Sequence, residues 1–268
     1  MNRIANAFKN GKAFIAFVIC GDPDYETTAE VVRAAVKGGA DLIELGIPFS
    51  DPTAEGPVIQ EANVRALSGG ATTDGAFELA KRLRENVDVP MVFMTYANVV
   101  YSYGGSSGSR IQPSRSGIDR FCDKCVEAGV DGIILPDVPF EEKEEFAPAC
   151  RARGLSFISL IAPTSESRIA TIAREAEGFL YVVSSLGVTG VRGEITTDIG
   201  AMVDLVRQNT GIPCAVGFGI STPKQAADMA ALSDGAIVGS AIVKLIAQYG
   251  KDAAGHVYEY VKSMKDAM

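Results

Sequence analysis

Asp41-Leu42-Ile43-Glu44-Leu45-Gly46-Ile47-Pro48-Phe49-Ser50-Asp51-Pro52 is the stretch that decides the fold of this chain. Its first part, 41–47, is a short apolar run with the length and composition of a buried β-strand. The run before it, 25–37, has apolar residues at helical spacing and stops at Gly38-Gly39, where a helix can end. A strand that follows a helix after a short turn is typical of a parallel α/β sheet.

The same apolar, β-branched pattern recurs along the chain, and a helical pattern separates most runs. With 41–47, the predicted strands are 13–19, 90–96, 132–137, 156–162, 179–184, 213–219 and 235–240. Eight strands are the number that closes a (β/α)8 TIM barrel, a fold of the α/β class. A doubly wound open sheet is disfavoured because Gly21-Asp22-Pro23, after the first strand, lacks the G-x-G-x-x-G fingerprint.

The helical patterns fill the gaps between these strands, and one more leads the chain. The predicted helices are 1–9, 25–37, 72–86, 118–128, 140–153, 167–177, 197–208, 223–232 and 253–266. A length of 268 residues suits one barrel, so we expect residues 1–268 to be a single domain with an extra N-terminal helix. The Gly/Ser-rich segment 104–117 shows no period, which predicts a flexible loop that looks inserted.

Charge and cysteine usage narrow the class of function. A net charge of −8 and a pI of about 4.9 disfavour binding to nucleic acid or to an anionic membrane. The N-terminus is amphipathic and lacks the apolar run of a signal peptide or a membrane span, so we expect a cytoplasmic protein. The five cysteines are scattered and odd in number, which predicts free thiols. Cys122 and Cys125 match C-x-x-C within a helical pattern, and we interpret them as helix packing.

Glycine turns follow three predicted strands in succession. They are the segment 184–190 after strand six, the segment 217–221 after strand seven, and Gly239-Ser240 after strand eight. Backbone amides at such turns and at a short helix N-terminus can hold a phosphate without any lysine, and barrels often carry this site there. We therefore predict a phosphate site, which also lets an acidic protein bind an anionic substrate.

Three carboxylates lie in or after the second strand. Glu44 alternates with Ile43 and Leu45, so its side chain faces the opposite side of the strand from theirs. Two interpretations remain open: a salt bridge inside the barrel, or a buried acid whose pKa is raised by desolvation. In the loop that follows, Asp51 suits a turn-bracing role, whereas Glu55 is better placed to reach a bound ligand.

Other kinds of catalytic group are missing from the strand ends. The single histidine, His256, falls in the terminal helix, which excludes a Ser–His or Cys–His nucleophile. No group of His, Cys and acidic residues has the spacing of a metal site, so we expect no metal. Acid–base catalysis by carboxylates remains.

Three motifs resemble those of the tryptophan synthase alpha subunits: the segment 44–52, Gly187-Val188-Thr189-Gly190 and Gly217-Phe218-Gly219-Ile220-Ser221. The resemblance covers nearly the whole chain apart from 104–117. It implies a lyase of tryptophan biosynthesis that cleaves indole-3-glycerol phosphate to indole and glyceraldehyde 3-phosphate by a retro-aldol reaction. It also implies no cofactor in this chain, and a β subunit carrying pyridoxal phosphate as its partner in an alpha-beta-beta-alpha heterotetramer.

The resemblance also implies a role for particular positions. Glu44 would protonate indole C3 and help the side-chain hydroxyl to lose its proton, and Glu55 would hydrogen-bond the indole N–H. The residues implied to line the substrate pocket are Phe17, Ile19, Tyr96, Leu135, Leu160, Tyr181 and Phe218. Those implied to hold the phosphate are Gly190, Gly219, Gly239 and Ser240.

Three positions depart from the family pattern. Ile19 stands where a threonine is expected, Glu55 where most members have aspartate, and Gly193 adds backbone freedom to a segment expected to act as a lid. The inserted-looking segment 104–117 is a further departure, and the resemblance implies that it lies near the face where the partner docks and weakens the association.

Two alternatives share the barrel. A non-catalytic or engineered scaffold would serve to display 104–117. A phosphosugar isomerase or indole-glycerol-phosphate synthase would use the same phosphate site, but the synthase needs a lysine at a strand end, and the lysines here avoid those positions. Turnover of indole-3-glycerol phosphate by the isolated chain separates the enzyme from the scaffold.

Overall fold

The structure is a computed structural model that describes residues 3–104, 115–183, 198–217 and 219–268. Its strands are β1 (Ala13–Ile19), β2 (Leu42–Gly46), β3 (Met91–Met94), β4 (Gly132–Ile134), β5 (Ser156–Phe157), β6 (Leu160–Ile161), β7 (Leu180–Val183), β8 (Cys214–Gly217) and β9 (Gly235–Val238). They form one parallel sheet in the order β5-β4-β3-β2-β1-β9-β8-β7-β6. The first and last strands pair through Ala13 and Gly235, as the closure of a barrel requires.

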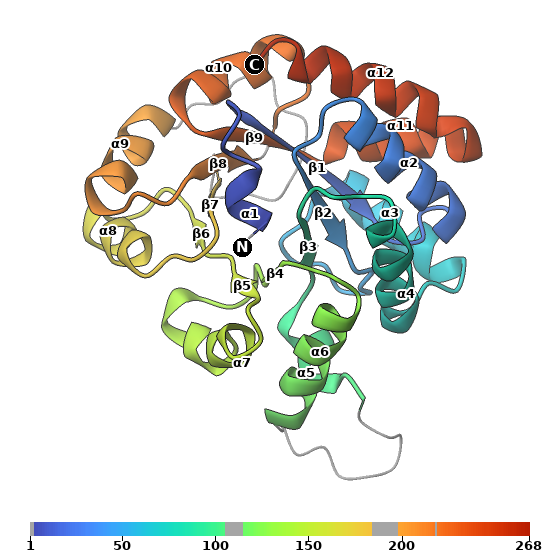
Figure 1. Ribbon diagram of the computed structural model, residues 1–268, viewed down its shortest axis with the longest axis horizontal. Coiled ribbons are helices and arrows are strands. Elements are labelled where there is room, and N and C mark those ends of the chain that lie inside the picture. Colours follow the sequence, from blue (N-terminus) through green and yellow to red (C-terminus); the bar gives the residue numbers. More distant parts are fainter. Residues whose placement is uncertain (1–2, 105–114, 184–197, 218) are drawn as a thin grey trace.

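The short strands β5 and β6 are two parts of the fifth predicted strand, 156–162, and they complete the ring. The Ile158 N–H donates to the Ile133 carbonyl of β4 at 2.9 Å, and the Ser159 carbonyl accepts from the Tyr181 N–H of β7 at 3.1 Å. One segment therefore bonds to the strand on either side, and the sheet curls around a central axis (Figure 1). The predicted barrel is confirmed, with this strand interrupted where it passes from one neighbour to the other.

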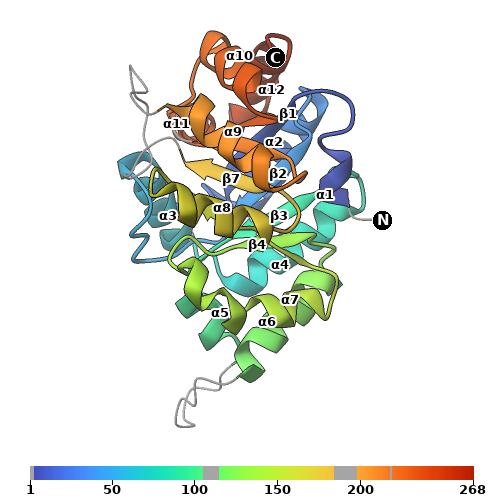
Figure 2. The ribbon, with the colours of Figure 1, turned by 90° about the vertical axis from the view of Figure 1, so that its left-hand side faces the viewer.

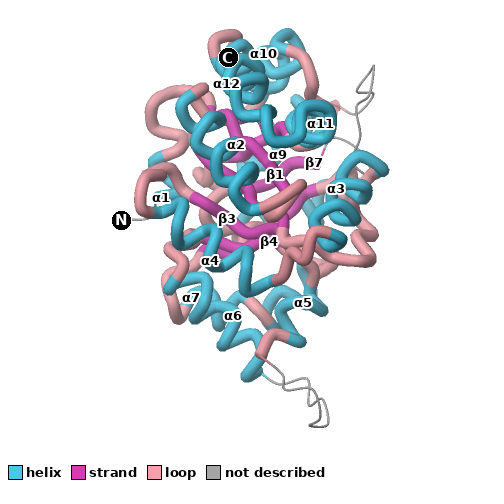
Figure 3. The backbone as a smooth tube through the Cα atoms, turned by 90° about the vertical axis from the view of Figure 1, so that its right-hand side faces the viewer, coloured by secondary structure: helices cyan, strands magenta, loops and turns pink. Residues whose placement is uncertain are grey.

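Helices cover the outside of the ring (Figures 1 and 3). They are α1 (Arg3–Asn6), α2 (Tyr25–Lys37), α3 (Pro57–Ser68), α4 (Thr73–Arg84), α5 (Ala97–Ser102), α6 (Arg115–Glu127), α7 (Ala147–Arg151), α8 (Glu166–Arg174), α9 (Ile199–Asn209), α10 (Pro223–Leu232), α11 (Ser240–Tyr249) and α12 (Ala253–Lys265), with 3-10 turns η1 (Phe140–Glu145) and η2 (Gly250–Asp252). Two of them, α1 and α3, instead lie at the ends of the barrel, because Ile4 of α1 and Ile59 of α3 pack with the apolar residues inside the ring. Figure 2 shows α1 and α3 at opposite ends of the barrel.

Side-chain caps explain where several helices begin. The Asp24 carboxylate accepts the Thr27 N–H at 2.7 Å ahead of α2. Thr222 and Gln225 form a reciprocal capping box at the start of α10. Such caps satisfy N–H groups that the first turn of a helix leaves without a partner, and the sequence can reveal them in advance.

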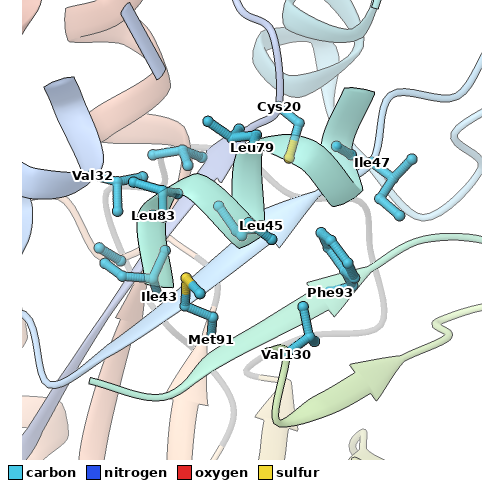
Figure 4. Packing of buried hydrophobic residues seen from close by; sticks show 14 of the residues in the cluster. Cys20, Val32, Ile43, Leu45, Ile47, Leu79, Leu83, Met91, Phe93 and Val130 are labelled. Carbon is cyan, nitrogen blue, oxygen red and sulfur yellow. The ribbon is translucent and has the colours of Figure 1, made fainter. Parts of the chain in front are cut away.

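Alternation along the strands divides the apolar residues into an inner and an outer set. The inner set of the barrel strands comprises Ile15, Phe17, Ile19, Leu42, Val92, Met94, Ile134, Ile158, Phe179, Tyr181, Val183, Ala215 and Ile237. The outer set includes Ile43 and Leu45, which lie beneath Leu79 and Leu83 of α4 (Figure 4). It also includes Phe93, whose ring contacts that of Phe77 on the same helix, with the centroids 5.4 Å apart. Glu44 lies between Ile43 and Leu45 and faces the other way, as its position in the sequence predicts.

Some predicted helices differ from the observed ones. The predicted helix 140–153 is divided into η1 and α7, because Pro148 has no N–H to donate and a continuous helix cannot pass through it. The predicted helix 1–9 is reduced to α1 within the described residues, and α6 begins at Arg115, ahead of the predicted 118. The helices α3, α5 and α11 are not among the predicted ones.

Candidate active site

Glu44 lies on β2 inside the barrel, where its side chain is wholly buried. The register places it beside Phe17 of β1 on one side and Val92 of β3 on the other. Neither carboxyl oxygen has a hydrogen-bond partner among the described residues, and no described lysine or arginine pairs with it. The described part of the chain therefore does not support a stabilising salt bridge, and the interpretation of Glu44 as a buried acid is favoured.

Glu55 lies in the loop between β2 and α3, and it is also buried. The Asn63 side chain donates from Nδ2 to Glu55 Oε2 at 2.9 Å, and the Tyr96 hydroxyl forms a second hydrogen bond with this carboxyl. The same hydroxyl accepts the Ala54 N–H at 3.2 Å, and the Tyr96 ring stacks on Phe49 with the centroids 5.0 Å apart. The loop that follows β2 is thus held against Tyr96, the second residue after β3.

The two carboxyls lie close enough for the charge of Glu55 to influence the ionisation of Glu44. Burial raises the pKa of Glu44 from 4.5 to about 8, and the charge of Glu55 adds to the rise. Burial raises the pKa of Glu55 to about 7, while the hydrogen bonds from Asn63 and Tyr96 act in the opposite direction. Two acids in a shared apolar site resist being charged together, so near neutral pH the pair holds a proton that it can donate.

Most of the apolar residues implied for the pocket lie on the inner face of the barrel. Phe17, Ile19 and Tyr181 belong to the inner set, and Leu160 packs against it from β6. Tyr181 is buried, and burial together with the charges of Glu44 and Glu55 raises the pKa of its hydroxyl. Ile19, which stands in place of the expected threonine, contributes apolar surface to the same inner face.

Leu135 does not lie where the resemblance implied, on the inner face of the barrel. It belongs to the outer set, whereas the residue before it, Ile134 of β4, belongs to the inner one. Side chains alternate between the two faces of a strand, so a shift of one position moves a residue from one face to the other. Ile134, together with Met94 of β3, therefore takes the inward place that the resemblance gave to Leu135.

Glycines leave room for the large inner side chains. A Cβ atom at Gly217 of β8 would lie 2.5 Å from Tyr181 Cε1, and one at Gly46 of β2 would lie 2.6 Å from Ile19 Cδ1. Both distances are far below a normal carbon–carbon contact. The absence of these two side chains lets Tyr181 and Ile19 lie across the neighbouring strands.

The glycines expected to bind phosphate follow β8 and β9. Gly219 has a φ of +80°, a conformation that residues with a side chain rarely adopt. Gly239 is the N-cap of α11 and Ser240 is the first residue of that helix. The first N–H groups of a helix lack acceptors within it and point at its N-terminal end, where they favour an anion. Gly190, Gly193, Phe218 and most of the segment 104–117 lie outside the described residues.

Asn63 is a site residue that the sequence analysis missed, because it falls in α3, a helix that was not predicted. Two signals could have revealed this helix: Pro57 directly after Gly56, and small or apolar residues at 59, 62 and 66. The hydrogen bond to Glu55 itself has no signature in the sequence.

Other features of the described residues add no further site. All five cysteines are buried and free. None of the helices in the described ranges is both long and apolar enough to span a bilayer.

The comparisons with known proteins agree with one another. The sequence profile of the family described as tryptophan synthase alpha chain matches residues 4–268. The tryptophan synthase alpha chain of Lacticaseibacillus casei is 44% identical over 268 residues, which are 100% of this chain and 96% of the relative. That of Lactiplantibacillus plantarum is 46% identical over 269 residues, covering 100% of this chain and 97% of the relative.

Solved structures give the same result. Tryptophan synthase subunit alpha from Legionella pneumophila has a TM-score of 0.86 and 35% identity, covering 100% of this chain and 98% of that one. A chain of the tryptophan synthase a2b2 complex from the hyperthermophile Pyrococcus furiosus has a TM-score of 0.84 and 32% identity, covering 96% and 99%.

Proposed function

Because this chain belongs to the tryptophan synthase alpha chain family, we propose that Glu44 and Glu55 are the two carboxylates that carry out its reaction. The reaction is the cleavage of indole-3-glycerol phosphate to indole and glyceraldehyde 3-phosphate, a lyase step of tryptophan biosynthesis. The alternative of a non-catalytic scaffold is not supported, since the family match spans nearly the whole chain.

One observation carries the assignment of Glu44. It is a wholly buried carboxyl, without a hydrogen-bond partner among the described residues, whose pKa is raised to about 8. A carboxyl that keeps its proton near neutral pH can act as a general acid, and enzymes obtain such groups by burying them among apolar side chains. Such a group lowers the stability of the fold, and a role in catalysis accounts for its presence.

The chemistry follows from the two roles. Glu44 donates its proton to indole C3, and the positive charge that develops at the indole nitrogen is stabilised by the Glu55 carboxylate beside the N–H. The ionised Glu44 then accepts the proton of the side-chain hydroxyl. The bond between C3 and the side chain breaks, its electron pair returns to the ring, and the hydroxyl carbon becomes the aldehyde of glyceraldehyde 3-phosphate. The proton that Glu44 donated stays on indole C3, and the proton taken from the hydroxyl restores the acid.

The remaining parts of the site bind the substrate. The inner residues Phe17, Ile19, Leu160 and Tyr181 provide apolar surface for the indole ring. Gly219, Gly239 and Ser240 offer backbone N–H groups to the phosphate. From the sequence motifs alone, we assign Gly190 to the phosphate site and Phe218 to the indole pocket. The acids and the phosphate site lie on strands and turns of one barrel, so their separation is fixed by the fold.

The chain carries no cofactor, and its partner is the β subunit, which holds pyridoxal phosphate. We propose that the two chains form an alpha-beta-beta-alpha assembly, in keeping with the a2b2 complex of the relative from Pyrococcus furiosus. We also propose that residues 1–268 are one domain, because the profile covers 4–268 and β1 pairs with β9. A place in the cytoplasm is proposed on the basis of the biosynthetic role.

The test is the rate of indole release by Glu44→Gln in the isolated chain. The amide occupies the same space but cannot donate an acidic proton, so we expect turnover to fall roughly a hundredfold or more with binding retained. The chain contains no tryptophan, so indole fluorescence reports the ligand and its product without a background from protein tryptophan.

A matched control is Glu30→Gln on α2, where the side chain is exposed. This variant should turn over like the parent. Near-parental turnover by Glu44→Gln would remove Glu44 from the mechanism.

A further inference from the structure

The Asn63 side chain is held in one orientation by three hydrogen bonds. Its Oδ1 accepts the Phe49 N–H at 2.9 Å, while its Nδ2 donates to the Ile59 carbonyl and to Glu55 Oε2, both at 2.9 Å. A flipped amide would place Nδ2 against an N–H donor and Oδ1 against two acceptors, which excludes it. Glu55 therefore faces a fixed donor.

The helix that carries Asn63 is itself anchored to the barrel. Two residues further along α3, the Arg65 guanidinium donates from Nε and Nη2 to the two Asp22 carboxyl oxygens, each at 2.8 Å. Asp22 is wholly buried in the loop after β1, so this fork joins α3 to the strand next to β2. The Gln60 side chain also donates to the Glu55 carbonyl at 2.8 Å, which fixes the backbone of the acid.

The donors are distributed unequally between the two buried acids. Glu55 receives hydrogen bonds from Asn63 and from Tyr96, whereas Glu44 receives none from the described residues. No described lysine or arginine forms an ion pair with either acid. Hydrogen-bond donors stabilise the charged form of a carboxyl, so Glu55 tolerates a negative charge better than Glu44 does. The shared proton therefore remains on Glu44.

We propose that Asn63 is the positioning residue that places the negative charge on Glu55 and thereby leaves the exchangeable proton on Glu44. The inference rests on the proposed roles of the two acids. The other titratable groups that face them, among the described residues, are Tyr96 after β3, with Asp137 beyond it, and Tyr181 on β7. Burial raises the pKa of both tyrosine hydroxyls, so both stay neutral over the pH range in which the two carboxyls titrate. Neither tyrosine therefore competes with Glu55 for the negative charge.

The experiment compares the pH profile of kcat/KM for the full chain and for Asn63→Leu, which keeps the approximate shape of the side chain and removes the donor. The acid limb of this profile reports the ionisation of Glu55 in the free enzyme. We expect it to move up by about one pH unit, the shift that corresponds to losing one hydrogen bond to a charged group. At pH 7 the ionised fraction, and with it kcat/KM, then falls about fivefold, and the deficit shrinks as the pH rises.

A matched control is Asn209→Leu on α9. Asn209 Nδ2 donates to the Leu205 carbonyl at 2.9 Å, the same bond to the carbonyl four residues earlier that Asn63 makes to Ile59, but it contacts no catalytic acid. The pH profile of this variant should match that of the parent. A deficit in Asn63→Leu that is the same at every pH would show a merely structural role and overturn the proposal.

A second measurement needs no folded Asn63 variant. With the side-chain carboxyl carbon of glutamate labelled with 13C, the parent protein should show Glu55 ionising at a lower pH than Glu44, the two signals being assigned from Glu44→Gln and Glu55→Gln. The reverse order would overturn the proposal. A failure of the proposed function can be distinguished from a failure of this inference. If Glu55 has no catalytic role, Glu55→Gln turns over at the parental rate, irrespective of the result for Asn63→Leu.

Discussion

Replacement of Glu44 by glutamine should stabilise the folded protein at neutral and alkaline pH, although it removes the proposed catalytic acid. Glu44 is wholly buried, and burial raises its pKa from 4.5 to about 8. The folded state therefore binds this proton more tightly than the unfolded state does. Glutamine has nearly the same shape and does not titrate, so the difference in stability between the two proteins isolates the cost of burying this acid.

The sign follows from the order of the two pKa values. Below pH 4.5 both states of the parent are protonated, and the acid carries no penalty from titration. Between 4.5 and about 8 the unfolded state is ionised while the folded state keeps its proton, so the parent loses about 1.4 kcal/mol of stability per pH unit. Above pH 8 the loss is complete and amounts to about 5 kcal/mol.

The assay is urea unfolding of the parent and of Glu44→Gln at pH 4.5, 7 and 9, followed by circular dichroism because the chain has no tryptophan. We expect the advantage of the variant to grow from pH 4.5 to pH 9. Glu30→Gln, at an exposed position, should show no such growth. An advantage of Glu44→Gln that is independent of pH, or a variant less stable than the parent at pH 9, would refute the reasoning.

Three other predictions test the remaining parts of the site. Gly219→Val should raise the KM for the phosphorylated substrate about tenfold, because φ is +80° there and a side chain would obstruct the amides; an unchanged KM would place the phosphate elsewhere. Gly217→Ala should lower the free energy of unfolding by roughly 1–3 kcal/mol and lower kcat, since the new Cβ would lie 2.5 Å from Tyr181 Cε1. A variant as stable as the parent would contradict this packing. Deletion of 105–114, a Gly/Ser-rich segment with little apolar surface, should leave the Tm and the isolated turnover near those of the parent, and should strengthen activation by the β subunit if the segment obstructs docking. The deletion ends at 114 because α6 begins at Arg115, and loss of folding would show the segment to be structural.

The sequence pattern did not predict where two short elements begin or divide: α11 after β9, and the strand in the segment 156–162. The helix α11 starts at Ser240, inside the predicted strand 235–240, because a strand that ends in glycine and a helix that follows at once share one apolar run. The segment 156–162 reads as one strand, yet it bonds to β4 with its first half and to β7 with its second. Local periodicity does not record which neighbour a strand pairs with.

The sequence by itself determined the eight-stranded barrel, the inward direction of Glu44 and the glycine turns expected to bind phosphate. These features depend on spacing between neighbouring residues, since alternation along a strand and the limits on backbone angles act locally. Only the tertiary structure showed that Asn63 holds Glu55, that Arg65 holds Asp22, and that Ile134 rather than Leu135 faces inward. Asp22 and Arg65 are 43 positions apart, so their contact depends on the path of the chain between them. Burial, which raises the pKa of Glu44, likewise arises only when strands distant in sequence close around it.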